Sequence, residues 1–597
     1  MTTYQVNLAR SLIPSASEYW QDSEKRRLLH VSASCGNPCP PGHSGVHDMR
    51  SVLALEMDAV KKVLSSLSIR YNSLSPANRL PSEILVHIFT FLQVADPPSV
   101  IEDDSHPTEY DIGWIYATHV CHHWRTVALE HSSLWSTIVL DLGSRWAAEF
   151  LRRSRMAPIA FRMVELGMTT GVDVAGTIKE HLGHIREFDI AARNAEEVHS
   201  FPLSLRGAAP ELEKASLHSN FRHWSDTIPT ATLPTDLFGR TAPRLRHLKI
   251  TCFRFSWPTL AFQSMTHLDI KQDPRAPRLD AELRDFDHCL RALADMPALE
   301  SIKLDHALPS LSPDVAVSFR TSVTSRTTLP NLHYLFLQDH VVECGLMLEY
   351  LVAPALLPTE TRVSFMLDPA GGRGSTYILP WLAAQVRAWS GSTIRALNIY
   401  SYKKDLHLAA WDSYSLGKDK SPTVPEDPPS PAGKSLLELS FHGVTEGTSE
   451  VFAELQTICQ LLPLDRLETL HISGCGRTCR TAQECITLFG NCQHVFHLEF
   501  TSFYERAFMK ALQARIPLGT GNDILFPALT SVTFSEIEFT YEYKDVDERV
   551  VRWLYLRSLL MPLRRVYIRK SAMNREMRKR IGEKVSEIIW DEEDLNR

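Results

Sequence analysis

The stretch Leu80-Pro81-Ser82-Glu83-Ile84-Leu85-Val86-His87-Ile88-Phe89-Thr90-Phe91-Leu92 decides the fold of the N-terminal part of this chain. Pro81 suits a first helical turn, where a missing N–H is tolerated, and Ser82 and Glu83 suit a helix start. Apolar residues then recur at helical spacing: Ile84, Leu85, Ile88, Phe89 and Leu92. This spacing predicts an amphipathic helix with one apolar stripe.

The segment Val120-Cys121-His122-His123-Trp124-Arg125 follows, and the whole stretch closes on Leu134-Trp135. A second apolar stripe runs through Val120, Cys121, Trp124, Val127 and Ala128. So many large apolar groups cannot all be buried within about 55 residues, because a small domain has too little interior. The surplus predicts a surface that a partner protein covers.

These segments resemble the F-box through the Leu-Pro-x-Glu-Ile-Leu start, the Ile88-Phe89 pair, the Val-Cys-x-x-Trp-Arg helix and the Leu-Trp end. The resemblance implies a three-helix module, residues 76–135, that docks onto the Skp-family adaptor of a cullin-type ubiquitin ligase. The docking residues that it implies are Leu80, Pro81, Ile84, Leu85, Ile88, Leu92, Trp114, Val120, Cys121 and Trp124. The other interpretation is an ordinary helical hairpin in which Cys121 and Trp124 are core residues. A Pro-rich, acidic insert at 94–111 departs from the F-box pattern and is tolerated at a surface, because loop-closure entropy grows slowly with length.

The segments before the module differ in pattern. Residues 1–50 contain many turn formers and no periodic stripe, which predicts a disordered tail. Residues 51–75 carry a heptad stripe: Leu53, Met57, Val60, Leu64, Leu67, Tyr71 and Leu74. A heptad helix of this length could form a coiled-coil homodimer, although such a helix more often packs on its own domain.

The composition excludes several classes of protein. The chain is 44% hydrophobic and 22% charged, as in ordinary folded proteins, and its net charge is −7. This charge argues against a nucleic-acid partner. No apolar run approaches the roughly 18 residues of a membrane span, and the start lacks a signal-peptide profile. Eleven irregularly spaced cysteines predict reduced thiols, so we expect a cytoplasmic or nuclear protein with no membrane partner.

Beyond Trp135 a pattern of three apolar residues, separated by two residues and then by one, returns about every 30 residues. Its copies include Leu245-Leu248-Ile250, Met265-Leu268-Ile270, Leu299-Ile302-Leu304, Leu332-Leu335-Leu337, Ile394-Leu397-Ile399, Leu436-Leu439-Phe441, Leu467-Leu470-Ile472 and Leu563-Val566-Ile568. One double interval contains a degraded copy near Val363. Short strands that recur with helical stretches between them must stack on one another. The alternative is one or two ordinary α/β domains.

The repeated pattern resembles the leucine-rich repeat, without most of its usual Asn positions. This resemblance implies an α/β fold: a helical F-box followed by an irregular leucine-rich-repeat-like solenoid over 136–572 with a parallel β-sheet. The layout, the Leu134–Ile138 join and the Arg152–Ile159 stretch look like those of fungal, basidiomycete-like F-box proteins. Residues 402–434, rich in Pro and charge, predict a disordered insert, and 573–597 a C-terminal helix and tail.

No cluster in the sequence has the spacing of an active site, so we expect no enzyme activity, no cofactor and no metal. Cys35, Cys39, His43 and His47 have potential zinc donors but not the usual spacing. The leading hypothesis is a substrate-recognition adaptor of an SCF-like ligase with an unknown target protein. The alternatives are a repeat-based scaffold without ubiquitin and a hydrolase or transferase hidden in the α/β part.

Target-binding residues follow from the strand pattern. Alternate residues of a strand point to opposite faces, so those between the repeated apolar positions should face the open, concave side. The candidates are Lys249, Asp269, Lys303, Phe336, Asn398, His471 and Tyr567, together with Tyr400, which lies just outside its strand and is expected to share this surface. Charges of both signs mixed with aromatics favour a protein or peptide over a polyanion.

Overall fold

The computed structural model divides the chain into two compact units, Met1–Leu134 and Trp135–Arg597. It describes residues 15–34, 44–101, 109–162, 173–192, 195–219, 231–274, 286–311, 319, 326–353, 361–366, 375–388, 393–402, 405–415, 428–432, 435–442, 449–474, 479, 481–501, 506–514, 524–537, 539, 544–571, 573 and 575–591. Cys35, Cys39 and His43 lie outside these ranges. Within the described part, no helix is both long and apolar enough to cross a membrane.

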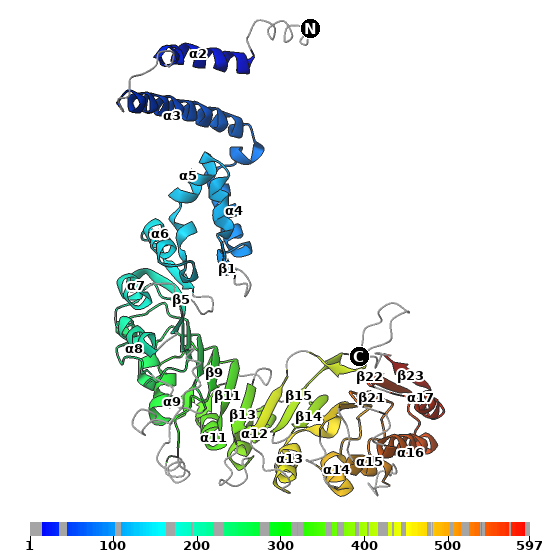
Figure 1. Cartoon of the computed structure of the whole chain (residues 1–597). Helices are drawn as coiled ribbons and strands as arrows, with labels where there is room; N and C mark the ends of the chain where they lie inside the picture. The colour runs from blue at the N-terminus through cyan, green and yellow to red at the C-terminus, as the bar shows by residue number, and fades with distance from the viewer. Residues whose placement is uncertain are drawn as a thin grey trace, which may run out of the picture. The chain divides into compact units, whose positions relative to one another are not determined.

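The first unit is mainly helical (Figure 1). Its helices are α2 (Ala16–Ser34), α3 (Ser44–Ser73), η1 (Pro76–Arg79), α4 (Ser82–Ala95), η2 (Gly113–His119), α5 (His122–Glu130) and η3 (Ser132–Trp135). The predicted helix after Pro81 is α4, and Pro81 is its N-cap residue. The predicted heptad helix, 51–75, corresponds to α3, which begins earlier than expected and ends at Ser73, before Leu74. Residues 16–34 differ from the expected disordered tail, because they form α2 and Arg27 bonds Glu56 of α3 at 2.9 Å.

The acidic insert starts and ends at one place in the first unit. Its strands β1 (Ser99–Ile101) and β2 (Glu109–Asp111) pair antiparallel. The Trp114 N–H donates to the Asp96 carbonyl oxygen at 2.8 Å, so the insert's ends meet. Gly113 between them has φ +51°, and a Cβ there would lie 2.4 Å from the same oxygen. A glycine is therefore required where the insert rejoins the module.

The second unit holds one long sheet with helices along one side (Figure 1). Its strands are β3 (Thr137–Val139), β4 (Ile159–Arg162), β5 (Ile185–Ala192), β6 (Lys214–Ser219), β7 (His247–Thr251), β8 (His267–Lys271), β9 (Ser301–Asp305), β11 (Tyr334–His340), β13 (Thr361–Met366), β14 (Ala396–Tyr402), β15 (Asp405–Trp411), β18 (Leu437–His442), β19 (Thr469–Ser473), β20 (His497–Thr501), β21 (Ser531–Ser535), β22 (Arg565–Arg569) and β23 (Glu587–Trp590). Its helices are α6 (Ser144–Ser154), α7 (Val174–His181), α8 (Ala195–Ser204), α9 (Phe286–Ala294), α11 (Val341–Tyr350), α12 (Ser375–Ala388), α13 (Ser449–Leu461), α14 (Ala482–Phe489), α15 (Arg506–Gln513), α16 (Lys544–Leu560) and α17 (Arg575–Gly582).

The strand register confirms the predicted parallel solenoid. Ile250 of β7 lies opposite Ile270 of β8, and Ile270 lies opposite Leu304 of β9. These apolar residues are buried and alternate with less buried residues along β7, β8 and β11, whereas Asp305 in β9, Thr533 in β21 and Tyr567 in β22 are buried as well. The repeated apolar positions therefore form a continuous core on the helix-covered face, and the other face of the sheet is open. The degraded copy near Val363 is also a strand, β13.

Among the described strands, the solenoid order is interrupted at one place. Strand β13 pairs with β18 rather than β14; β18 pairs with β15, β15 with β14, and β14 with β19. Both pairings of β15 are antiparallel, and the other described pairings of the long sheet are parallel. The expected disordered insert 402–434 is therefore wrong for 405–411. Leu406, Leu408 and Ala410 are buried and alternate with partly exposed residues, so one face of this strand packs into the core.

The C-terminal segment also differs from the expected helix and tail. Helix α17 is present, but β23 follows it and extends the sheet by pairing parallel with β22. Residues 592–597 lie outside the described part.

Candidate functional site

The F-box-like module is built around a small apolar core. Leu85 and Phe89 of α4 are fully buried, and the Phe89 ring contacts Trp124 edge-on at 5.4 Å between centroids. The Cys121 sulfur caps α5 by accepting the Trp124 N–H at 3.5 Å, and the Cys121 thiol donates to Asn78 at 3.3 Å. This packing fixes α4 against α5.

The predicted docking residues divide between this core and the surface. Pro81, Ile84, Ile88 and Val120 are exposed, and Leu80, Leu92, Cys121 and Trp124 are partly buried. Leu85 (0% exposed) and Trp114 (3% exposed) are buried inside the module. These two cannot contact an adaptor directly, because their side chains already fill the core.

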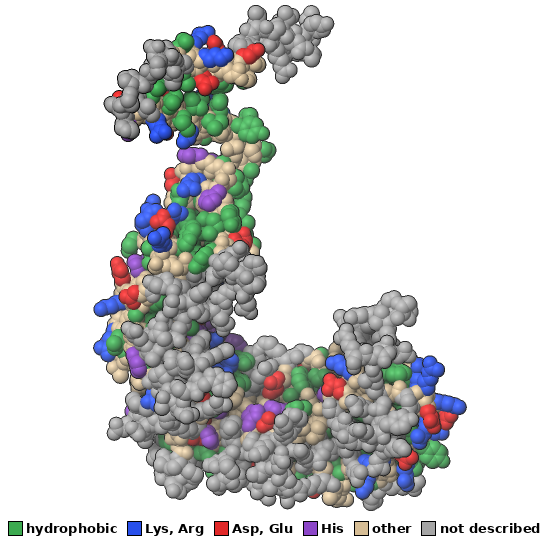
Figure 2. Space-filling model, in the orientation of Figure 1, with side chains coloured by type: hydrophobic (Ala, Val, Ile, Leu, Met, Phe, Trp, Pro, Cys, Tyr) green, Lys and Arg blue, Asp and Glu red, His purple; other side chains and the backbone are tan. Residues whose placement is uncertain are grey.

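The structure adds docking candidates that the sequence analysis missed. Phe91 and Val94 of α4 expose 75% and 82% of their surface, and they continue the line of Ile84 and Ile88 at helical spacing. Tyr116 of η2 is 56% exposed. Ile84, Ile88, Phe91 and Val94 are named here the α4 stripe, and Figure 2 shows hydrophobic side chains gathered over this helix. The helical spacing of apolar residues that predicted α4 could have identified all four residues of the α4 stripe.

Helix α3 also carries uncovered apolar residues. Its heptad positions are exposed: Leu53, Met57, Val60, Leu64, Leu67 and Tyr71, followed by Leu74. The expected packing of this stripe on its own domain is absent among the described residues. The stripe remains a candidate for a coiled-coil homodimer.

The open face of the sheet carries most of the predicted target-binding residues. Lys249 and Tyr400 are exposed, and Asp269, Lys303, Phe336, Asn398 and His471 are partly exposed. The Lys303 ammonium lies 3.9 Å from Asp269 and 5.7 Å from the Phe336 ring centroid. Tyr567 is only 3% exposed, so the prediction that it lies on an accessible surface is wrong. In β22 it does lie between the repeated apolar residues Val566 and Ile568, as predicted, and it pairs with Thr533 of β21.

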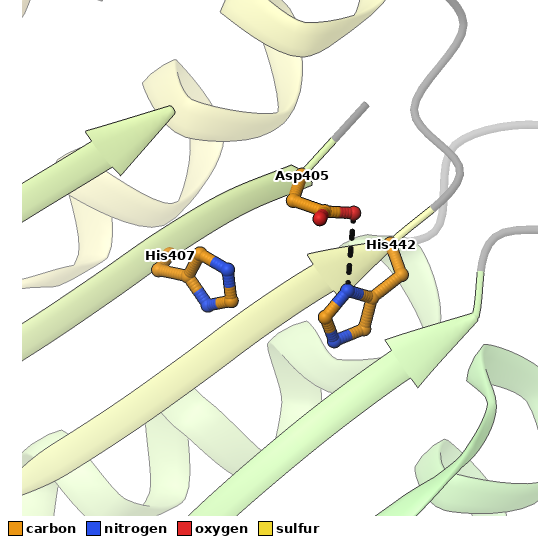
Figure 3. A group of neighbouring side chains, drawn as sticks. All are labelled: Asp405, His407 and His442. Carbon is orange, nitrogen blue, oxygen red and sulfur yellow. Dashed lines mark hydrogen bonds and ion pairs between the residues drawn. The ribbon is translucent and has the colours of Figure 1, made fainter. Parts of the chain in front are cut away.

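A further group on the open face, which the sequence analysis did not predict, lies where the solenoid order is interrupted. Asp405 and His407 are alternate residues of β15, and His442 ends the neighbouring strand β18 (Figure 3). One ligand atom from each of the three lies within 4.8 Å of the others. The His442 Nδ1 is 3.1 Å from Asp405 Oδ1. These donor types and distances could hold a metal ion.

Burial affects the histidines of this face. Burial is the main cause that lowers the pKa of His407, and the nearby His442 adds to it. Burial likewise lowers the pKa of His471, and it lowers the pKa of His497 to about 3. The neutral form of these rings is therefore favoured, because a buried charge is poorly solvated.

Comparisons with known proteins agree with the first unit's geometry. An F-box-like family model matches residues 77–141. A search of curated proteins found no match. Among solved structures, the chain is similar to the leucine-rich repeat-containing protein LegL7 from Legionella pneumophila, with 11% identity and a TM-score of 0.19 over 65% of this chain and 86% of that one. The segment 77–141, which contains α4, η2 and α5, is F-box-like.

Proposed function

We propose that this protein is a substrate-recognition adaptor of a cullin-type, SCF-like ubiquitin ligase of the fungal kind. The F-box-like module docks the Skp-family adaptor, and the open face of the sheet binds a target protein in the cytoplasm or nucleus. The chain itself performs no chemistry. It promotes ubiquitination, and hence degradation, by holding the target near a charged ubiquitin-conjugating enzyme, which raises the effective concentration.

The observation that carries this proposal is the α4 stripe within the F-box-like segment. Helix α4 is apolar on two sides: Leu85 and Phe89 face the core, whereas Ile84, Ile88 and Phe91 face outward. A row of exposed apolar residues on a helix lowers the solubility of a protein unless a partner covers the row. A protein adaptor that buries this row supplies the missing partner.

The open face supports the second half of the proposal. Positive and negative side chains lie next to one another on this face. Lys271 Nζ is 3.0 Å from Asp305, and Lys303 pairs with Asp269. Phe336 and Tyr400 add partly exposed aromatic surface among these charges. Mixed charges with aromatic residues match the composition of protein-binding surfaces rather than polyanion-binding ones.

The test is co-elution of the full chain with a purified Skp-family adaptor. The variant Ile84→Asp/Ile88→Asp places charges in the stripe and should abolish the complex, because desolvating an unpaired carboxylate is costly. The matched control is Tyr555→Ser/Leu559→Ser, which alters two exposed residues of α16 in the other unit and should leave the complex intact.

Two outcomes would contradict the proposal. If the wild-type chain fails to bind the adaptor while it still captures its target, the protein is a repeat-based scaffold without a role in ubiquitination. If the double variant binds as wild type does, the docking surface lies elsewhere on the module.

A further inference from the structure

The three side chains at the interruption of the solenoid come together through the strand register. In the β15–β18 ladder Leu406 lies opposite Phe441 and His407 opposite Ser440. The antiparallel register consequently places Asp405 beside His442 at the next position. Asp405 and His407 share the open face, since residues two apart in a strand point the same way. Two neighbouring strands thus direct two imidazoles and one carboxylate to one spot (Figure 3).

We propose that Asp405, His407 and His442 form a zinc-binding site on the open face. Zinc is bound by imidazole nitrogen and carboxylate oxygen, and three protein ligands with one open position is a common arrangement. The spacing of the three donor atoms, within 4.8 Å of one another, fits ligands that converge on one ion. Each residue is partly exposed, so the ion has a route from solvent.

The surroundings orient the two rings. The Ser440 Oγ lies 2.7 Å from His407 Nδ1, and the Ser364 Oγ lies 2.6 Å from His442 Nε2. Ser364 is itself 6% exposed and belongs to the adjacent strand β13. Hydrogen bonds of this kind to the second nitrogen fix the ring orientation of metal-binding histidines. The hydrogen bond between His442 Nε2 and the Ser364 hydroxyl leaves His442 Nδ1 facing Asp405, and in a zinc-bound state the Nε2–H would donate to Ser364 Oγ.

The opposing interpretation is a plain hydrogen-bonded Asp405–His442 pair with His407 as a neighbour. That pair resembles Asp189 and His218, which lie 3.2 Å apart on strands β5 and β6 and together supply only two potential metal ligands. In the zinc interpretation His407 is a required ligand, whereas in the plain hydrogen-bonded pair it has no role.

The proposed zinc site would link the antiparallel strand β15 to its neighbour β18. Strand β15 breaks the parallel order, and two of the three ligands belong to it. Bound zinc would tie β15 to β18 beside the exposed Tyr400, whose ring centroid is 5.6 Å from that of His407. The fourth position of the ion would remain available to water or to a side chain of the bound target.

The experiment is titration of the full chain with Zn²⁺, measured by isothermal calorimetry and by competition with a chromogenic chelator. We expect one zinc per chain at a site that is lost in His407→Ala and in His442→Ala, with affinity reduced at least about tenfold in Ser364→Ala. The control His218→Ala should leave this site unchanged. Replacing zinc with Co²⁺ should give the visible absorption of a tetrahedral ion.

Folding of each variant is checked by its thermal transition, and His442→Gln serves as a second variant that retains a polar side chain opposite Ser364. Loss of the zinc site in folded His407→Ala supports the proposal. The proposal is overturned if the wild-type chain binds no stoichiometric zinc, or if folded His407→Ala and His442→Gln bind it as tightly as the wild type.

Discussion

Phe91 provides a sharp test of the adaptor surface, because it is the largest residue of the α4 stripe and lies outside the docking set that the sequence implied. The change is Phe91→Ala, with Ile88→Ala for comparison. Phe91 is 75% exposed and Ile88 is 37% exposed in the free chain. If the adaptor covers the stripe, the affinity that each residue contributes should follow the area that it still has to bury.

The size of each effect follows from these fractions. Complete burial of a large apolar side chain contributes roughly 1.5–3 kcal/mol. Covering the exposed part of Phe91 then contributes about 1–2 kcal/mol, and covering that of Ile88 about 0.5–1 kcal/mol. These energies correspond to affinity losses of about 5- to 30-fold for Phe91→Ala and about 2- to 5-fold for Ile88→Ala.

The assay is calorimetric titration of each variant with the Skp-family adaptor, together with urea unfolding of the free chain. Phe89→Ala is the matched control, because Phe89 is two residues away but fully buried. It should cost about 3–5 kcal/mol of folding stability, whereas Phe91→Ala should leave unfolding nearly unchanged. Adaptor binding by Phe91→Ala equal to that of the wild type would refute the extension of the stripe, and unfolding of Phe91→Ala would show that its ring is packed in the free chain.

Three other changes test the fold that carries these surfaces. Gly113→Ala should lower the thermal stability of the first unit by about 1–3 kcal/mol, because its Cβ meets the Asp96 carbonyl oxygen; an unchanged melting temperature would contradict the tight turn. Arg557, 3% exposed, donates to the carbonyls of Leu525, Phe526 and Leu529, so Arg557→Met should destabilise the second unit by about 1–3 kcal/mol or more in urea unfolding, and a neutral result would mean that water replaces it. His497, whose folded pKa is about 3 against 6.5, binds protons more readily when unfolded, so stability should be full above about pH 6.5 and fall progressively towards pH 3. His497→Gln should flatten that decline, and an identical pH profile would show that other groups cause it.

The repeats could be predicted because their signal is local. The triplet Leu245-Leu248-Ile250, for example, is buried in and just before β7, and the next triplet along the chain belongs to β8, which pairs with β7. Strand β15 was missed for the opposite reason. The Pro-rich composition around 422–431 extended the expected insert back over Leu406 and Leu408, whose alternation indicates a strand. Its place between β14 and β18 is a tertiary pairing that no local pattern encodes.

The candidate sites show the same limit. In α4, residues on both sides of the helix are apolar, so the period could indicate the helix but not which of Ile84 and Leu85 faces inward. Tertiary packing decides this: Phe89 packs on Trp124, and Leu85, one turn earlier on the same side of α4, is fully buried. For the zinc site, the alternation of Asp405 and His407 was visible in the sequence. His442 belongs to a distant segment and joins them only through the ladder of β15 and β18.

The interrupted strand order also constrains the sequence of events in folding. In a regular solenoid each new strand adds to the one before it, so folding can proceed from any nucleus to its next neighbour. Here growth from β3 to β13 must stop, because the next place in the sheet belongs to β18, whose Leu439 pairs with Val363. Strands β14, β15 and β18 have to assemble as a block before the two ends of the sheet can join. The closing contact pairs Val363 with Leu439, which lie 76 residues apart in the chain, and such non-local pairings slow folding. The joining of this block is therefore the step at which the nascent chain is most exposed to mispairing.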